Sequence, residues 1–117
     1  ANGACASVLG GYYNDAAGGG SAVVGGNNND TFGNFSTIAA GQNNIITCTG
    51  MNGFIAGGQS NCVRHCNSIA MGTCTSSVSS NMLHVNRLYA SNIPTSNPGV
   101  AGVLWNDSGT LKVSTNI

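Results

Sequence analysis

The sequence predicts an all-β protein: a parallel β-roll, or β-solenoid, of about five short coils with a small C-terminal β-hairpin region. Three observations predict this class. A short motif recurs five times, the composition disfavours helix, and a hairpin signal centred on a glycine stands near the C-terminus. We expect the roll to occupy residues 1–77 and the strand and hairpin region to occupy residues 78–117.

The repeat consists of five segments that align on one glycine: SVLGGYYN, AVVGGNNN, TIAAGQNN, FIAGGQSN and SIAMGTCT. The anchor glycines are Gly11, Gly26, Gly41, Gly58 and Gly72, which lie 15, 15, 17 and 14 residues apart. Three positions before each anchor stands a β-branched residue, namely Val8, Val23, Ile38, Ile55 and Ile69. A segment this short cannot bury a core alone, whereas stacked coils can. We therefore expect these five side chains to form one buried column.

Two further columns predict the turns of each coil. We expect the anchor glycine to adopt a positive φ, which glycine does without steric cost. The residue before the anchor is mostly very small, which indicates a thin interior. Three positions after the anchor stand Asn14, Asn29, Asn44 and Asn61, with Thr75 in the last copy. Asn tolerates left-handed backbone and caps turns, so we expect this column at the corner of the roll.

The composition excludes several classes of protein. Glycine costs about 1 kcal/mol relative to alanine inside a helix, and Asn, Ser and Thr compete for backbone hydrogen bonds; the chain contains eighteen glycines and is rich in these polar residues. Only three basic and three acidic residues are present, which gives no electrostatic basis for binding nucleic acid. No apolar run approaches the roughly 20 residues of a membrane-spanning helix. We expect neither nucleic-acid binding nor membrane insertion.

The C-terminal segment has a different pattern. Leu83 and Val85 indicate a strand, and residues 94–99 are rich in turn formers. Two apolar runs, 103–105 and 110–113, flank a four-residue loop at 106–109 that ends in glycine, which predicts a β-hairpin. Trp105 is interpreted as a packing anchor of this hairpin.

The cysteines allow three interpretations. A thin roll gains stability from covalent cross-links in an oxidising setting, so we expect at least one disulfide among Cys48, Cys62, Cys66 and Cys74. Their connectivity stays open, and Cys5 is left over. Thiolates of these residues, together with His65, are an alternative set of zinc ligands. Free cysteines that act as small apolar side chains are the third possibility.

The chain offers few groups for catalysis. Glu is absent, and neither His65 nor His84 has an acidic residue in an obvious supporting position. We expect no enzyme activity and no cofactor. The aromatic residues Tyr12, Tyr13, Phe32 and Phe35 are candidates for exposed contacts with carbohydrate, and the alternative is packing against a neighbouring chain.

The repeats resemble those of a known family. The strings SIAMG, TIAAG and FIAGG are similar to the head repeat of trimeric autotransporter adhesins, the YadA-like head, over roughly residues 6–77. This resemblance implies a left-handed roll whose three parallel chains associate into a homotrimer. The sequence departs from the family in its five cysteines and in the longer Gly58 coil. The segment from Asn81 to Ser114 resembles a stretch near the C-terminal part of phage tail-fibre and other virion proteins.

Together the two resemblances imply a virion or extracellular protein. We expect a non-enzymatic structural or attachment segment of a phage fibre or tailspike, which assembles with itself and presents loops to a glycan or protein of the host surface. A cell-surface trimeric adhesin head, a virion decoration protein and an extracellular filament subunit stay open as alternatives. Ice binding is disfavoured because the threonines form no single column.

Overall fold

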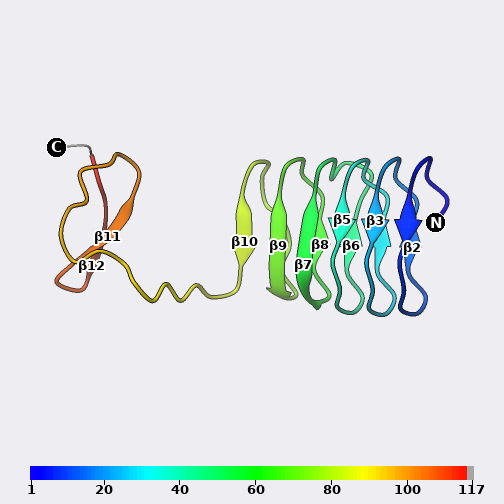
Figure 1. The fold of residues 1–117 in the computed structure, drawn as a ribbon, viewed down its shortest axis with the longest axis horizontal. Coiled ribbons are helices and arrows are strands. Elements are labelled where there is room, and N and C mark those ends of the chain that lie inside the picture. The colour runs from blue at the N-terminus through cyan, green and yellow to red at the C-terminus, as the bar shows by residue number, and fades with distance from the viewer. Residues whose placement is uncertain (116–117) are drawn as a thin grey trace. The chain divides into compact units, whose positions relative to one another are not determined.

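The structure is a computed structural model that describes residues 1–115, and all regular elements in this range are β-strands (Figure 1). The chain divides into two compact units, Ala1–Asn86 and Arg87–Ile117. No helix in the described range has the length and apolarity needed to cross a membrane.

The first unit is a parallel β-solenoid built from two sheets. The six-stranded sheet contains β1 (Ser7–Val8), β3 (Ala22–Val23), β5 (Thr37–Ile38), β7 (Phe54–Gln59), β9 (Ile69–Thr73) and β10 (Leu83–Val85). The four-stranded sheet contains β2 (Asp15–Ala16), β4 (Asp30–Thr31), β6 (Ile45–Ile46) and β8 (Cys62–Val63). The chain alternates between the sheets, so each coil consists of a strand, a turn, a strand and a second turn. The predicted stack of about five coils is confirmed.

The core is a single layer of small and β-branched side chains between the two sheets. Within residues 1–115, seven apolar side chains are fully buried: Ala16, Val23, Ile38, Ile46, Ile55, Val63 and Ala70. Val8 is half-buried and packs against this cluster. The register pairs Val8 with Val23, Val23 with Ile38, and Ile38 with Ile55, so the predicted column is confirmed over these four positions.

The prediction is wrong for the fifth member of the column, Ile69. Ile69 is 37% exposed and pairs with Phe54, whereas Ala70 pairs with Ile55 and is fully buried. The pairing shifts between Ile55 and Gly57, where Ala56 has no partner across the ladder. A β-bulge of this kind places two residues of one strand opposite one residue of its neighbour. The fifth coil therefore has one residue fewer between its core position, Ala70, and its anchor glycine, Gly72.

The anchor glycines have the predicted positive φ, with values from 87° at Gly11 to 133° at Gly72. Close approach of the next coil also requires glycine here. A Cβ placed on Gly26 would lie 2.2 Å from the carbonyl oxygen of Gly41, and one on Gly41 would lie 2.2 Å from that of Gly58. These positions therefore need glycine both for φ and for space.

The asparagine column after the anchors lies inside the roll, not at an exposed corner. Asn29, Asn44 and Asn61 are fully buried or nearly so. Each Nδ2 group donates to the Oδ1 atom of the asparagine one coil earlier: Asn29 to Asn14, Asn44 to Asn29, and Asn61 to Asn44, at 2.9–3.1 Å. The left-handed turn residue is the preceding one, at Tyr13, Asn28, Asn43, Ser60 and Cys74.

The end of the roll is closed by side chains from a short sixth coil. His84 pairs with Ala70 at the end of the core column. Its Nε2 atom accepts from the Val78 amide at 3.1 Å, and its Nδ1 atom therefore donates to the Ile69 carbonyl at 3.2 Å. Asn86 uses its side-chain amide to pair with both backbone groups of Thr73. Because β10 continues the sheet, the division between units falls after Asn86 and not at the expected residue 77.

The second unit contains the predicted hairpin, formed by β11 (Leu104–Asp107) and β12 (Thr110–Val113). The connecting turn is shorter than the expected four residues, because Asp107 already pairs with Thr110. Ser108 and Gly109 both have positive φ, 52° and 95°, as a type I′ turn requires. Lys112 pairs with the Asp107 carboxylate and lies 5.6 Å from the Trp105 ring centroid.

Candidate functional site

The outer face of the six-stranded sheet carries two rows of outward side chains, because residues on either side of a buried strand position point to solvent. The register places one row at Ser7, Ala22, Thr37, Phe54, Ile69 and Leu83. The first members of this row are small or polar. From Phe54 onward the row is apolar, and Leu83 is 55% exposed.

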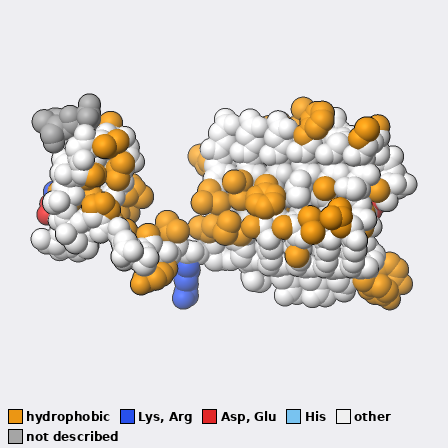
Figure 2. Space-filling model, viewed as in Figure 1, with side chains coloured by type: hydrophobic (Ala, Val, Ile, Leu, Met, Phe, Trp, Pro, Cys, Tyr) orange, Lys and Arg blue, Asp and Glu red, His pale blue; other side chains and the backbone are white. Residues whose placement is uncertain are grey.

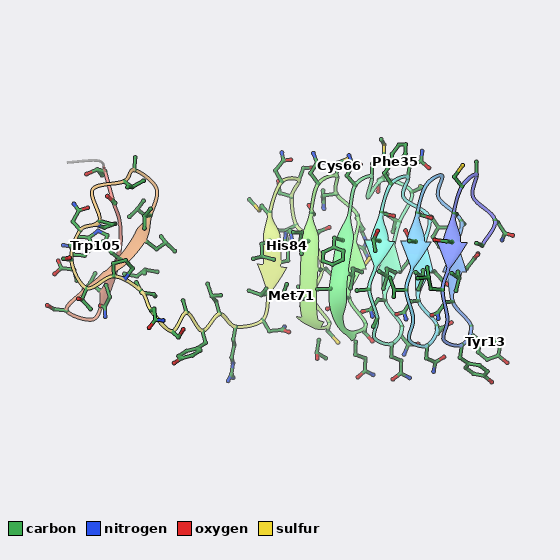
Figure 3. All side chains as sticks on the ribbon, viewed as in Figure 1. Tyr13, Phe35, Cys66, Met71, His84 and Trp105 are labelled. Carbon is green, nitrogen blue, oxygen red and sulfur yellow. The ribbon has the colours of Figure 1, made fainter. Side chains whose placement is uncertain are left out.

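The second row lies on the other side of the core column and consists of Leu9, Val24, Ala39, Met71 and Val85, with the bulge at Ala56 and Gly57 between Ala39 and Met71. Every member is apolar. Leu9 is 68% exposed and Val24 is 46% exposed. Figure 2 shows hydrophobic side chains gathered in a band along the roll, and Figure 3 places Met71 and His84 on this sheet. We call these two rows the apolar face.

The outer face of the four-stranded sheet is more polar. Asp15 and Asp30 stand in register on β2 and β4, followed by Ile45 and Cys62. Burial raises the pKa of Asp30, and the neighbouring Asp15 carboxylate raises it further, although a hydrogen bond from the Asp15 backbone lowers it. The two sheets therefore differ in character, and the longer run of apolar residues in register lies on the six-stranded sheet.

The four aromatic residues singled out in the sequence are all exposed: Tyr12, Tyr13, Phe32 and Phe35. Only Tyr12 and Tyr13 contact each other, with ring centroids 4.2 Å apart and planes inclined by 49°. A hydrogen bond with the Tyr13 side chain raises the pKa of Tyr12. Figure 3 shows Phe35 at the opposite edge of the roll from Tyr13, so the aromatic residues do not form one site.

The five cysteines are all free thiols, and the expected disulfide is not formed. Position separates Cys74 from two of its candidate partners. Cys74 lies in the turn that follows the six-stranded sheet, whereas Cys48 and Cys66 lie in turns that follow the four-stranded sheet. The Cys66 thiol donates to the Thr49 carbonyl at 3.4 Å. Cys62 stands in β8 and pairs with Ile45 and Ser76.

The cluster of ligands considered for zinc is not assembled. In residues 1–115, no group of three or more His, Cys, Asp or Glu side chains lies close enough to hold a metal ion. His65 instead has Nδ1 at 2.8 Å from the Ser77 hydroxyl, which also accepts from the Arg64 amide at 2.8 Å. This pair was not foreseen from the sequence. No carboxylate within the described range hydrogen-bonds to His65, and Ser77 serves to satisfy the last backbone donor of the four-stranded sheet.

The second unit contains a hollow of about 490 Å³ with a mostly apolar lining. Its walls come from the segment before the hairpin and from both hairpin strands: Leu88, Ala90, Asn92, Ile93, Pro94, Leu104 and Leu111. No acidic or basic side chain lines it. The lining therefore offers packing surface but no group suited to acid–base chemistry.

Comparison with known proteins adds no family assignment. The sequence matches no protein-family model, and a search of curated proteins found no similar sequence.

Proposed function

We propose that the chain is a non-enzymatic structural and attachment segment of a virion fibre or tailspike, which works outside the cell as a homotrimer of parallel chains. The observation that carries the proposal is the apolar face of the six-stranded sheet. Large contiguous apolar surfaces are uncommon on monomeric proteins and mark sites of association, and this face exposes the side chains of Leu9, Val24, Ile69, Met71 and Leu83. The resemblance of the repeats to adhesin heads and of the C-terminal segment to tail fibres supports the same assignment.

The partner that suits this face best is another copy of the same roll. Both rows of the face repeat at the spacing of the coils, about 4.8 Å between neighbouring strands. Parallel copies placed side by side would therefore bring equivalent coils together along the whole length. The face also carries no charged side chain, so copies would approach without repulsion between like charges.

The proposed role in attachment is mechanical and not catalytic. A stack of coils held by a close-packed core and by ladders of hydrogen bonds is a stiff support for the turns at its edges. Those turns are exposed and differ in sequence from coil to coil, as contact surfaces on repeat proteins commonly do.

The proposal is tested by the oligomeric state. Phe54→Thr, Ile69→Thr and Met71→Ala replace apolar residues of the face by residues that occupy the same rows in other coils, namely Thr37 and Ala39. We expect the unaltered chain to sediment as a trimer at micromolar concentration. The triple variant should sediment as a monomer with its β-sheet circular dichroism retained.

A matched control is available on the other sheet. Phe32 is also an exposed aromatic residue, and Thr47 occupies the same row one coil later, so Phe32→Thr is the equivalent change outside the face. This variant should remain trimeric. A stable monomer of the unaltered chain, or a trimer that survives the triple substitution, contradicts the proposal.

A further inference from the structure

One edge of the roll carries a row of side-chain amides that ends in the two tyrosines. Tyr12, Asn27, Gln42 and Gln59 occupy equivalent turn positions, and their backbones are bridged in parallel from each coil to the next. Tyr13 lies beside Tyr12 and is 73% exposed. We call these five residues the amide strip. Figure 3 shows Tyr13 at the lower edge of the roll, where the turns project into solvent.

The amides of the strip differ from the other asparagine rows of the roll in having no internal partners. The buried asparagines bond to one another, and on the exposed surface Asn28 bonds to Asn43. By contrast, the side chains of Asn27, Gln42 and Gln59 make no hydrogen bond within the described part of the chain. Both the donor and the acceptor of each amide therefore remain available to a ligand.

The chemistry of the strip fits a neutral carbohydrate. No member of the strip carries a charge, which gives an anionic polymer no counter-charge. A side-chain amide donates and accepts at once, as adjacent hydroxyl groups on a sugar ring require. The contacting tyrosine rings offer an apolar surface with a polar rim, which suits the carbon–hydrogen face of a pyranose.

The spacing of the strip adds a second argument. Successive positions are separated by the distance between parallel strands, about 4.8 Å. This is close to the rise of one sugar in an extended β-linked pyranose chain. An oligosaccharide lying along the edge could therefore place one sugar opposite each coil.

We propose that the amide strip binds an extended, uncharged, β-linked polysaccharide, with the tyrosines stacking on a sugar at one end and the amides bonding to the sugars that follow. This deepens the proposed attachment function by naming the chemical class of the surface ligand, and it rests on that function. It also separates Tyr12 and Tyr13 from Phe32 and Phe35, which lie outside the strip.

The test titrates the full chain with two neutral probes, cellohexaose and the hexamer of β-linked N-acetylglucosamine, and with polygalacturonate as an anionic probe. Tyr12→Asn with Tyr13→Asn installs the residues that the second coil has at these positions, Asn27 and Asn28. Gln42→Thr with Gln59→Thr installs the residue of the fifth coil, Thr73. Each double variant should weaken binding of a neutral hexamer about ten-fold or more, the loss expected from two neutral hydrogen bonds or a stacked ring pair.

The matched control is Phe35→Asn. Phe35 is an exposed aromatic residue with positive φ at the opposite edge, and Asn52 and Asn67 occupy its position in later coils. This variant should bind as the unaltered chain does. Failure to bind either neutral hexamer, unchanged binding in both double variants, or equal binding of polygalacturonate overturns the inference. Sedimentation of the same samples separates the two proposals, because a trimer that binds no glycan overturns this inference alone.

Discussion

The buried asparagine ladder decides how tightly successive coils are joined. An amide transferred from water to an apolar interior is destabilising unless its polar atoms are paired. Here the Oδ1 atom of Asn44 accepts both from the Asn61 amide and from its Nδ2 group, at 3.0 Å each. Each asparagine of the ladder therefore accepts hydrogen bonds from both the side chain and the backbone amide of the asparagine in the next coil.

Asn44→Ala should destabilise the roll more than its small change in volume suggests. The substitution leaves the buried backbone N–H of Asn61 without its acceptor, which costs about 1–3 kcal/mol, and it also removes the hydrogen bonds that the Asn44 side-chain amide donates to Asn29 and to the Gly58 carbonyl. We expect the free energy of unfolding in urea to fall by about 3 kcal/mol. Gln42→Ala, two residues earlier and exposed, is the control and should change stability little. Equal stability of the two variants would show that the ladder contributes nothing.

Asp30 gives the roll a predictable dependence on pH. Its pKa is raised in the folded state above the ordinary value of 3.8 by burial and by the Asp15 carboxylate. A carboxyl group with a raised folded pKa stabilises the protein below its unfolded pKa, and this stability is lost as pH rises through the folded pKa.

Asp30→Asn should therefore be more stable than the unaltered chain at neutral pH, while the difference disappears below pH 3.8. Thermal melts across this range provide the measurement. Asp107→Asn is the control, because Asp107 lies in the second unit and pairs with Lys112. An Asp30→Asn variant that loses stability with rising pH as steeply as the unaltered chain would rule out the carboxylate pair as the cause.

At the level of single residues, the sequence predicted which apolar side chains form the core column, but it did not predict which polar side chains are buried. The column of Val8, Val23, Ile38 and Ile55 was predictable because β-branched residues recur beside an invariant glycine of the repeat. The burial of Asn44 was not, since the same residue type serves exposed turns and internal ladders equally well. Only the pairing of coils distinguishes these two environments.

At the scale of the element, the coils vary in length, and the structure shows in which turn the extra residues lie. The third coil is two residues longer than its predecessors, and the extra length lies in its second turn. There Gly50 donates to the Thr47 carbonyl and Gly53 donates to the Gly50 carbonyl, so Cys48 and Thr49 project outward. The core positions on both sides of this insertion keep their pairing. Sequence spacing alone revealed the insertion but not its place in the coil.

The fifth coil is one residue shorter before its anchor glycine, and this difference led to a wrong prediction of its core residue. It falls between the core position and the anchor, and the bulge at Ala56 absorbs it. Aligning the repeats on the glycine therefore placed Ile69 in the core, where Ala70 stands. The hairpin was predictable because Ser108 and Gly109 form a turn with a strong local signal.

The sixth coil should act as a cap whose removal weakens the roll. A fragment of residues 1–86 retains His84 and Asn86, which occupy the open edge of β9. A fragment of residues 1–77 ends before them and exposes Ala70 and the backbone of Thr73. We expect the 1–86 fragment to unfold cooperatively, and the 1–77 fragment to melt at a lower temperature. Identical melting temperatures would mean that residues 78–86 do not stabilise the solenoid.

At the scale of the whole molecule, the character of the apolar face determines how assembly should respond to salt. Charges are screened at distances beyond a Debye length of about 10 Å in 0.1 M salt. An interface without charges has little to lose from screening, and sulfate strengthens apolar burial. We expect the proposed trimer to persist between about 0.05 and 0.5 M sodium chloride, and to tighten in ammonium sulfate. Dissociation on adding sodium chloride would indicate an electrostatic interface elsewhere on the roll.

The direction of the hydrogen bonds between coils has a mechanical consequence. The ladders join each coil to the next along the axis of the roll, while the strands run across it. Tension applied to the two ends of unit Ala1–Asn86 would therefore peel coils away one at a time, and would not load all of them together. A coil of 15 residues, the ladder spacing of Asn29 and Asn44, releases about 50 Å of chain when it opens. Stretching a single roll should give a series of small, nearly equal extensions, with one longer step where the third coil opens.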